Sequence, residues 1–107
     1  MPRAPSDTVL RRVAHARDMR IEYTLTASRV GGVTFYGVTV AMTSGGGFEC
    51  AELCELTGDR ALAVAVLDAL ARGSVTPCAA AGVAEDMVAE AAMRSTLRAV
   101  KSRLCRG

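Results

Sequence analysis

Apolar and polar residues alternate along two neighbouring stretches of the chain. In residues 20–28 the apolar positions fall on every second residue: Ile21, Tyr23, Leu25 and Ala27. A period of two puts such residues on one face of an extended chain, which predicts a half-buried strand. Residues 33–42 are rich in β-branched and aromatic side chains and predict a second strand. Gly37 lies on the face opposite Tyr36 and Val38, where it leaves room for a neighbouring backbone or a bulge.

A third, shorter strand is predicted over residues 48–54, where the pattern is mixed. Short turns at residues 31–32 and 44–47 separate the three strands. Because such short connections join antiparallel neighbours, we expect a three-stranded antiparallel meander. The glutamates around the third strand are typical of an edge strand that charge protects from pairing with other chains.

The longest apolar run, residues 60–72, consists mostly of Ala, Leu and Val and predicts a buried helix. We expect Thr57 as its N-cap, with Asp59 in the first turn, where the helix dipole favours an acid. Gly73 follows the run directly and suits a left-handed residue at the end of the helix.

A second helix is predicted over residues 77–104, where apolar residues keep helical spacing. Pro77 suits the first helical position, and Thr76 before it is the expected cap. Gly82 interrupts the pattern, so we expect the helix to bend or break there.

The N-terminal residues 6–19 carry a thin apolar stripe formed by Val9, Val13 and Ala16. This spacing predicts either a short helix, which is marginal without packing partners, or a mobile lead-in. The predicted fold class is therefore α+β, with a three-stranded antiparallel meander, two helices packed on one face (βββαα), and an extra N-terminal helix as an option. We expect a mobile or weakly helical segment over residues 1–19 and a single α+β domain over residues 20–107.

Composition narrows the class of protein. The 107 residues include no Trp and few other aromatics, so Ala, Val, Leu and Met must build the core. Four cysteines and a single histidine lack the paired spacing of a zinc site, so we expect free thiols, no metal and no cofactor. No apolar run is long enough to cross a bilayer, and the first arginines have no apolar segment behind them. The sequence therefore predicts a cytoplasmic protein without a membrane partner.

Four short motifs occur in order along the chain: Tyr36-Gly37-Val38, residues 52–57, Val75-Thr76-Pro77 and Val83-Ala84-Glu85-Asp86. Together they resemble a family of short clostridial proteins known as a domain of unknown function, over about residues 20–90. The resemblance implies the layout of three strands followed by helices, and it implies no activity. The arginine-rich N-terminal lead, the basic C-terminal extension and the alanine-rich residues 79–82 depart from the pattern of that family.

The formal net charge is only +2, but acidic and basic residues are segregated along the chain. Acids border the third predicted strand: Glu49, Glu52, Glu55 and Asp59. We expect this border to bind a basic protein partner or the basic ends of another copy of the chain. Cations crowd the end of the second helix: Arg94, Arg98, Lys101 and Arg103. Their spacing gives a basic stripe, for which contact with nucleic-acid phosphates is the alternative interpretation.

Candidate catalytic residues do not form a recognisable set. The histidine, His15, falls in the N-terminal lead, and the adjacent acids Glu85 and Asp86 point about 100° apart on a helix. We therefore interpret the protein as a small non-enzymatic binding or regulatory module that acts through contacts with a protein partner or a second copy. A weak nucleic-acid binder is the alternative, and an inhibitor encoded by a phage or mobile element is a further one.

Overall fold

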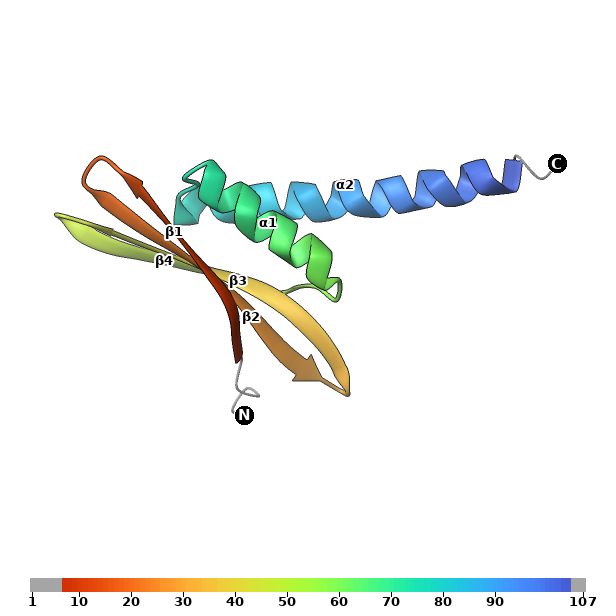
Figure 1. Ribbon diagram of the computed structural model, residues 1–107, viewed down its shortest axis with the longest axis horizontal. Helices are drawn as coiled ribbons and strands as arrows, with labels where there is room; N and C mark the ends of the chain where they lie inside the picture. Colours follow the sequence, from red (N-terminus) through yellow and green to blue (C-terminus); the bar gives the residue numbers. More distant parts are fainter. Residues whose placement is uncertain (1–6, 105–107) are drawn as a thin grey trace.

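The computed structural model describes the backbone of residues 7–104 and the side chains of residues 7–96. Its elements are β1 (Asp7–Ala16), β2 (Met19–Val30), β3 (Val33–Ser44), β4 (Gly47–Thr57), α1 (Arg60–Arg72) and α2 (Pro77–Leu104). The four strands form one antiparallel sheet in chain order, and both helices lie on the same face of it (Figure 1). The α+β class is confirmed, but the sheet has four strands rather than the predicted three.

The additional strand, β1, replaces the N-terminal helix expected over residues 6–19 and pairs with β2 along its length. A register shift between Thr8 and Leu10 breaks the alternation of the strand there. Val9 packs against the core, whereas Val13 lies opposite Glu22 on the open face, so two valines spaced like one face of a helix are on different faces of the strand. This bulge explains why the periodicity predicted the wrong element.

The core lies between the sheet and the helices. The apolar faces of β2 and β3, predicted from the alternation, supply its sheet side: Ile21, Tyr23, Leu25, Val38 and Val40. The helices supply the opposite side: Ala63, Val66, Leu67, Leu70, Ala80 and Ala84. Because several of the helical residues are alanines, the helices pack closely over the larger side chains of the sheet.

The start of α1 differs in one detail from the prediction. Asp59, not Thr57, is the N-cap, and its Oδ1 accepts hydrogen bonds of 3.0 and 3.3 Å from the backbone N–H groups of Ala61 and Leu62. The hydroxyl oxygen of Thr57 accepts a bond of 3.0 Å from the N–H of Asp59. Asp59 caps better here because its carboxylate meets the first free N–H groups and the positive end of the helix dipole.

At the end of α1, the left-handed residue is Ser74, with a φ of 48°, rather than the predicted Gly73, with a φ of −85°. The N–H of Val75 donates to the carbonyl oxygen of Leu70 at 3.1 Å, which closes the helix end. The helix therefore ends at Arg72 with Gly73 as its C-cap, and the left-handed residue comes one position later than expected.

Gly37 admits a bulge in the edge strand β4, as its position predicted. Tyr36 lies opposite Thr57, but Val38 lies opposite Leu53, so three residues of β4 face Gly37 alone. A β-carbon on Gly37 would collide with the carbonyl oxygen of Leu53. The missing side chain therefore sets where β4 bends.

The second helix, α2, begins at Pro77, as predicted, but it runs through Gly82 without a break. Its 28 residues correspond to about 42 Å of helix. Ala80 and Ala84 are buried against the body, whereas the end of α2 extends away from the sheet (Figure 1).

Candidate functional site

The acids expected to form one protein-binding border are divided between different surfaces. Glu49 lies opposite Met42, which packs against the core, so Glu49 is on the helix side of the sheet. Glu52 is three residues further along the same strand and lies on the open side. Glu55 is exposed in the bulge with a φ of 49°, and Asp59 caps α1. These acids share the edge of the molecule at β4, but they do not form one face.

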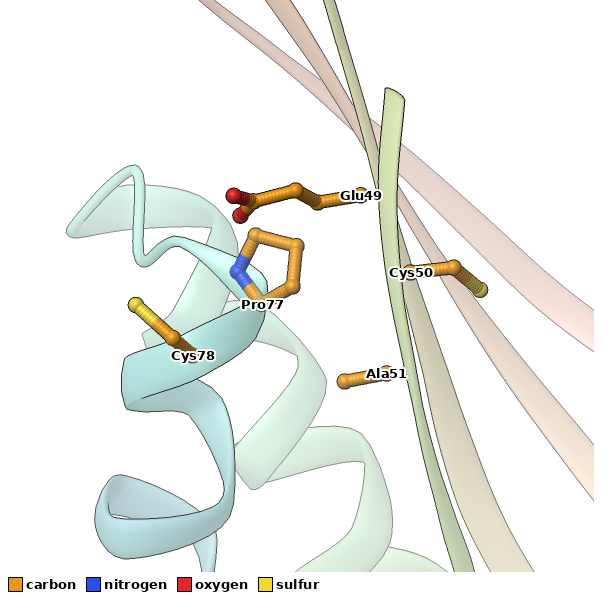
Figure 2. Close-up of a pocket in the computed structure, with 5 residues that line it drawn as sticks. All are labelled: Glu49, Cys50, Ala51, Pro77 and Cys78. Carbon is orange, nitrogen blue, oxygen red and sulfur yellow. The ribbon is translucent and has the colours of Figure 1, made fainter. Parts of the chain in front are cut away.

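A shallow groove of about 400 Å³ lies between β4 and the start of α2, lined by Glu49, Cys50, Ala51, Pro77 and Cys78. Figure 2 shows the carboxylate of Glu49 reaching toward Pro77, whereas the thiol of Cys50 lies on the far side of β4. Cys78 also points away from the groove, and its Sγ is 3.5 Å from Oγ1 of Thr76. The groove therefore has an acidic rim and an apolar wall, and its two thiols do not face each other.

The histidine is far from the cysteines of β4. His15 is exposed on β1, at the opposite edge of the sheet. Three strand spacings separate these edges, or roughly 14 Å, which is too far for His15 to activate a thiol of β4. Cys50, Cys54 and Cys78 are not joined in disulfides. Within the described residues, no group of three or more His, Cys, Asp or Glu residues is placed to hold a metal ion.

The sheet face that carries no helix is polar and mixes charges of both signs. Cross-strand pairing arranges one row as Arg11, Thr24, Thr39 and Glu52. Glu22 on this face pairs with Arg11 at 3.4 Å and with Arg20 at 3.1 Å. An aromatic residue, Phe48, lies at one corner with 67% of its surface exposed. Because the cations are balanced by acids, this face attracts a polyanion only weakly.

The basic residues predicted at the end of α2 lie on a helical segment that extends beyond the body. Arg94 is exposed and its Nη2 is 2.6 Å from Oε1 of Glu90, one turn earlier. Arg98, Lys101 and Arg103 belong to the same helix, but their side chains lie outside the described residues. Every side chain from Ala92 to Thr96 is exposed.

Sequence reasoning did not single out Glu90 or Met93 as site residues. Met93 leaves 65% of its surface exposed, and Phe48 on the sheet is another large apolar side chain with a similar exposure, 67%. The spacing of Glu90 and Arg94 by four residues indicates an ion pair on one face of the helix. The exposure of Met93 could not be predicted from the sequence, because it depends on where the sheet stops covering α2.

In the part of the chain that the structure describes, neither helix combines the length and the hydrophobicity that a membrane span requires. Residues 8–90 match the DUF6514 family, described as a family of unknown function. This chain belongs to the DUF6514 family. The DUF6514 region comprises the sheet except Asp7, α1 and the first half of α2, and it ends at Glu90. The expected resemblance to a domain of unknown function is confirmed and extends further toward the N-terminus than predicted. No curated protein and no solved structure matches the chain.

Proposed function

We propose that this DUF6514 protein is a small, non-enzymatic binding module that acts through contacts with a protein partner. The observation that supports this most is the exposed end of α2, which begins where the family match ends. We call residues 91–104 the distal arm. A helix that leaves the body with an exposed Met93 offers apolar surface that a partner can cover.

The distal arm suits a partner that is acidic and partly apolar. It carries four cations and no acid: Arg94, Arg98, Lys101 and Arg103. By helical spacing, Met93 and Leu97 lie beside these cations rather than on the opposite face. A protein surface with an apolar strip and acidic borders complements this pattern. An inhibitor would be one form of such a module, in which the bound partner loses its activity.

The acids at β4 are proposed as a second protein-binding surface, for a basic partner. Glu49 at the rim of the groove and Glu55 in the bulge are exposed, and Glu52 adds charge on the open side of the sheet. Asp59 contributes less to this proposal, because its role as N-cap already accounts for it. We also propose a cytoplasmic location, since no disulfide joins the described cysteines. The clostridial origin that the sequence resemblance implies stays a prediction.

The alternative, a weak nucleic-acid binder, uses the same cations of the distal arm. Helical cations contact phosphates without a particular base sequence, and such binding weakens steeply with salt. The two functions differ in what Met93 does, because an apolar side chain adds little to phosphate binding but much to a protein contact.

The test is a cross-linking capture in the native cell with the tagged full-length chain, with and without nuclease. The arm variant Arg94→Glu/Arg98→Glu is compared with a control variant, Arg29→Glu/Arg60→Glu, which makes the same charge change at exposed sites outside the arm. We expect a protein that survives nuclease treatment and that the arm variant loses but the control retains. Loss of all captured material on nuclease treatment would establish the alternative. Equal capture by both variants would remove the arm from the proposal.

A further inference from the structure

Acidic and basic residues are separated along the axis of α2. The first half of the helix, residues 77–90, contains Glu85, Asp86 and Glu90 and no cation. The distal arm contains cations and no acid. All three acids and Arg94 are exposed on the side of α2 that the body does not cover. The two halves of this helix are therefore complementary in charge.

Residues four apart form one ridge along a helix, and one ridge of α2 reads acid, acid, cation, cation. Its members are Asp86, Glu90, Arg94 and Arg98. The ion pair between Glu90 and Arg94 lies at the centre of this ridge. On both sides of the centre, like charges are neighbours four residues apart, which weakens an isolated helix. An external set of opposite charges would relieve both repulsions.

We propose that α2 pairs with α2 of a second copy of this chain, antiparallel, about a twofold axis near residue 92. This inference rests on the proposed function, and it identifies the partner of the distal arm. In this arrangement Arg94 faces Glu90 of the second copy, and helix position 98 lies across from position 86 of the second copy. The acidic half of the ridge in one copy then lies against the basic half in the other copy, so every charge on the ridge has a neighbour of opposite sign.

The neighbouring ridge of α2 has a similar order, with its midpoint at Met93, one residue from the midpoint of the first ridge, and supplies apolar contacts. Its members are Glu85, Ala89, Met93, Leu97 and Lys101. Ala89 and Met93 are exposed in the single chain. In the antiparallel pair, Met93 lies near the twofold axis, Ala89 is opposite Leu97, and the charged ends of the ridge are opposite each other. The exposed surface of Met93 is thereby covered.

Antiparallel pairing is favoured over other arrangements by the order of the charges. A parallel pair would place acids against acids and cations against cations. The proposed pair uses exposed positions of α2 and leaves the buried positions Ala80 and Ala84 packed on the body. A twofold interface is also closed, so the association stops at a dimer. A single pair of helices buries little area, so monomers and dimers should exchange.

The test is analytical ultracentrifugation of the full-length chain over a wide range of micromolar concentrations, at low and high salt. We expect the mass to rise from 11.2 kDa toward that of two chains as concentration increases. High salt should weaken the dimer, because the charges on these ridges are exposed to solvent. If the measured mass stays that of a single chain at every concentration in low salt, the proposed pairing is wrong.

Two charge-reversed variants make the test specific to the ridge. Asp86→Arg/Glu90→Arg makes the ridge wholly basic, and Arg94→Glu/Arg98→Glu makes it wholly acidic. Each variant alone should raise the dissociation constant of the dimer roughly tenfold or more, and an equal mixture of the two should restore the dimer. Circular dichroism of each variant reports its helix content. Folded variants that still dimerise alone, or whose mixture does not dimerise, contradict the pairing.

Two outcomes distinguish self-pairing of α2 from binding of a different protein by the distal arm. If the wild-type chain is monomeric and the acidic-ridge variant still loses a protein partner in the cell, the arm binds another protein and the self-pairing is wrong. If the chain dimerises as expected but no other protein is captured, the second copy is the partner.

Discussion

The hydroxyl of Tyr23 donates a hydrogen bond of 2.8 Å to the carbonyl oxygen of Val75. Tyr23 is in the middle of β2 with no exposed surface, and Val75 belongs to the linker between α1 and α2. The bond therefore ties the centre of the sheet to the segment from which α2 starts. The bond is one of the contacts that position the start of α2 over the sheet.

Replacing Tyr23 by Phe leaves the carbonyl oxygen of Val75 without its partner in a partly buried position. We expect Tyr23→Phe to lower the free energy of unfolding by about 1–2 kcal/mol. Urea denaturation followed by circular dichroism measures this change. Tyr36→Phe, at a partly buried tyrosine of β3, is the control and should cost less than about 0.5 kcal/mol. Equal effects of the two substitutions would mean that the Val75 bond does not stabilise the fold.

The same tyrosine makes stability depend on alkaline pH. Burial raises the pKa of Tyr23 above its ordinary value of 10.0. Above about pH 10 the unfolded chain loses the phenolic proton while the folded chain retains it, so the free energy of unfolding falls as pH rises. This loss is absent from Tyr23→Phe, so its stability difference from wild type should narrow between about pH 9 and about pH 11. Urea midpoints that run parallel over this range would contradict a buried, protonated Tyr23.

Replacing Gly37 or Gly82 by alanine should change the free energy of unfolding in opposite directions. Gly37→Ala places a β-carbon against the carbonyl oxygen of Leu53 and should cost about 1–3 kcal/mol of stability. Gly82→Ala adds a β-carbon in open space within α2 and should stabilise the protein by about 0.5–1 kcal/mol. Both changes are measured as shifts in the denaturation midpoint. A stabilising Gly37→Ala would show that β4 does not approach β3 as described.

Substitutions of Asp59 distinguish its role in capping α1 from a role in binding a partner. Asp59→Ala removes the acceptor of the Ala61 and Leu62 N–H groups and should cost about 1 kcal/mol, whereas Asp59→Asn keeps an acceptor and should cost much less. Thermal denaturation of the two variants compares these effects. If Asp59→Asn instead leaves the fold stable but weakens partner capture, Asp59 belongs to the binding surface.

The sequence predicted β2 and β3 because their core-facing positions are apolar without interruption. It did not predict β1, for two physical reasons. The bulge between Thr8 and Leu10 shifts the phase of its alternation. In addition, Arg12 lies opposite Tyr23 on the core side of the sheet and pairs with Asp68 of α1 at 3.2 Å. A cation on the inner face looks polar in the sequence, and its partner 56 residues away is visible only in the fold.

The candidate sites were predictable only in part. Residues alternate between the two faces of a strand, so the separation of Glu49 from Glu52 follows from their spacing. The bulge that holds Glu55 depends on the close approach of β4 to Gly37, which the spacing of the acids does not reveal. The charge order along α2 was present in the sequence. The exposure of Met93 adds that this part of α2 lies beyond the sheet and is open to a partner, which only the structure shows.

Hydrogen exchange along α2, followed by mass spectrometry at low and high protein concentration, tests the central claim most directly. If the distal arm is covered by another copy, amides of residues 91–104 should exchange more slowly as concentration rises, while the turn at Gly31 and Gly32 remains unchanged. High salt should reverse this protection. Exchange in the distal arm that is independent of concentration would contradict an antiparallel pair of α2 helices.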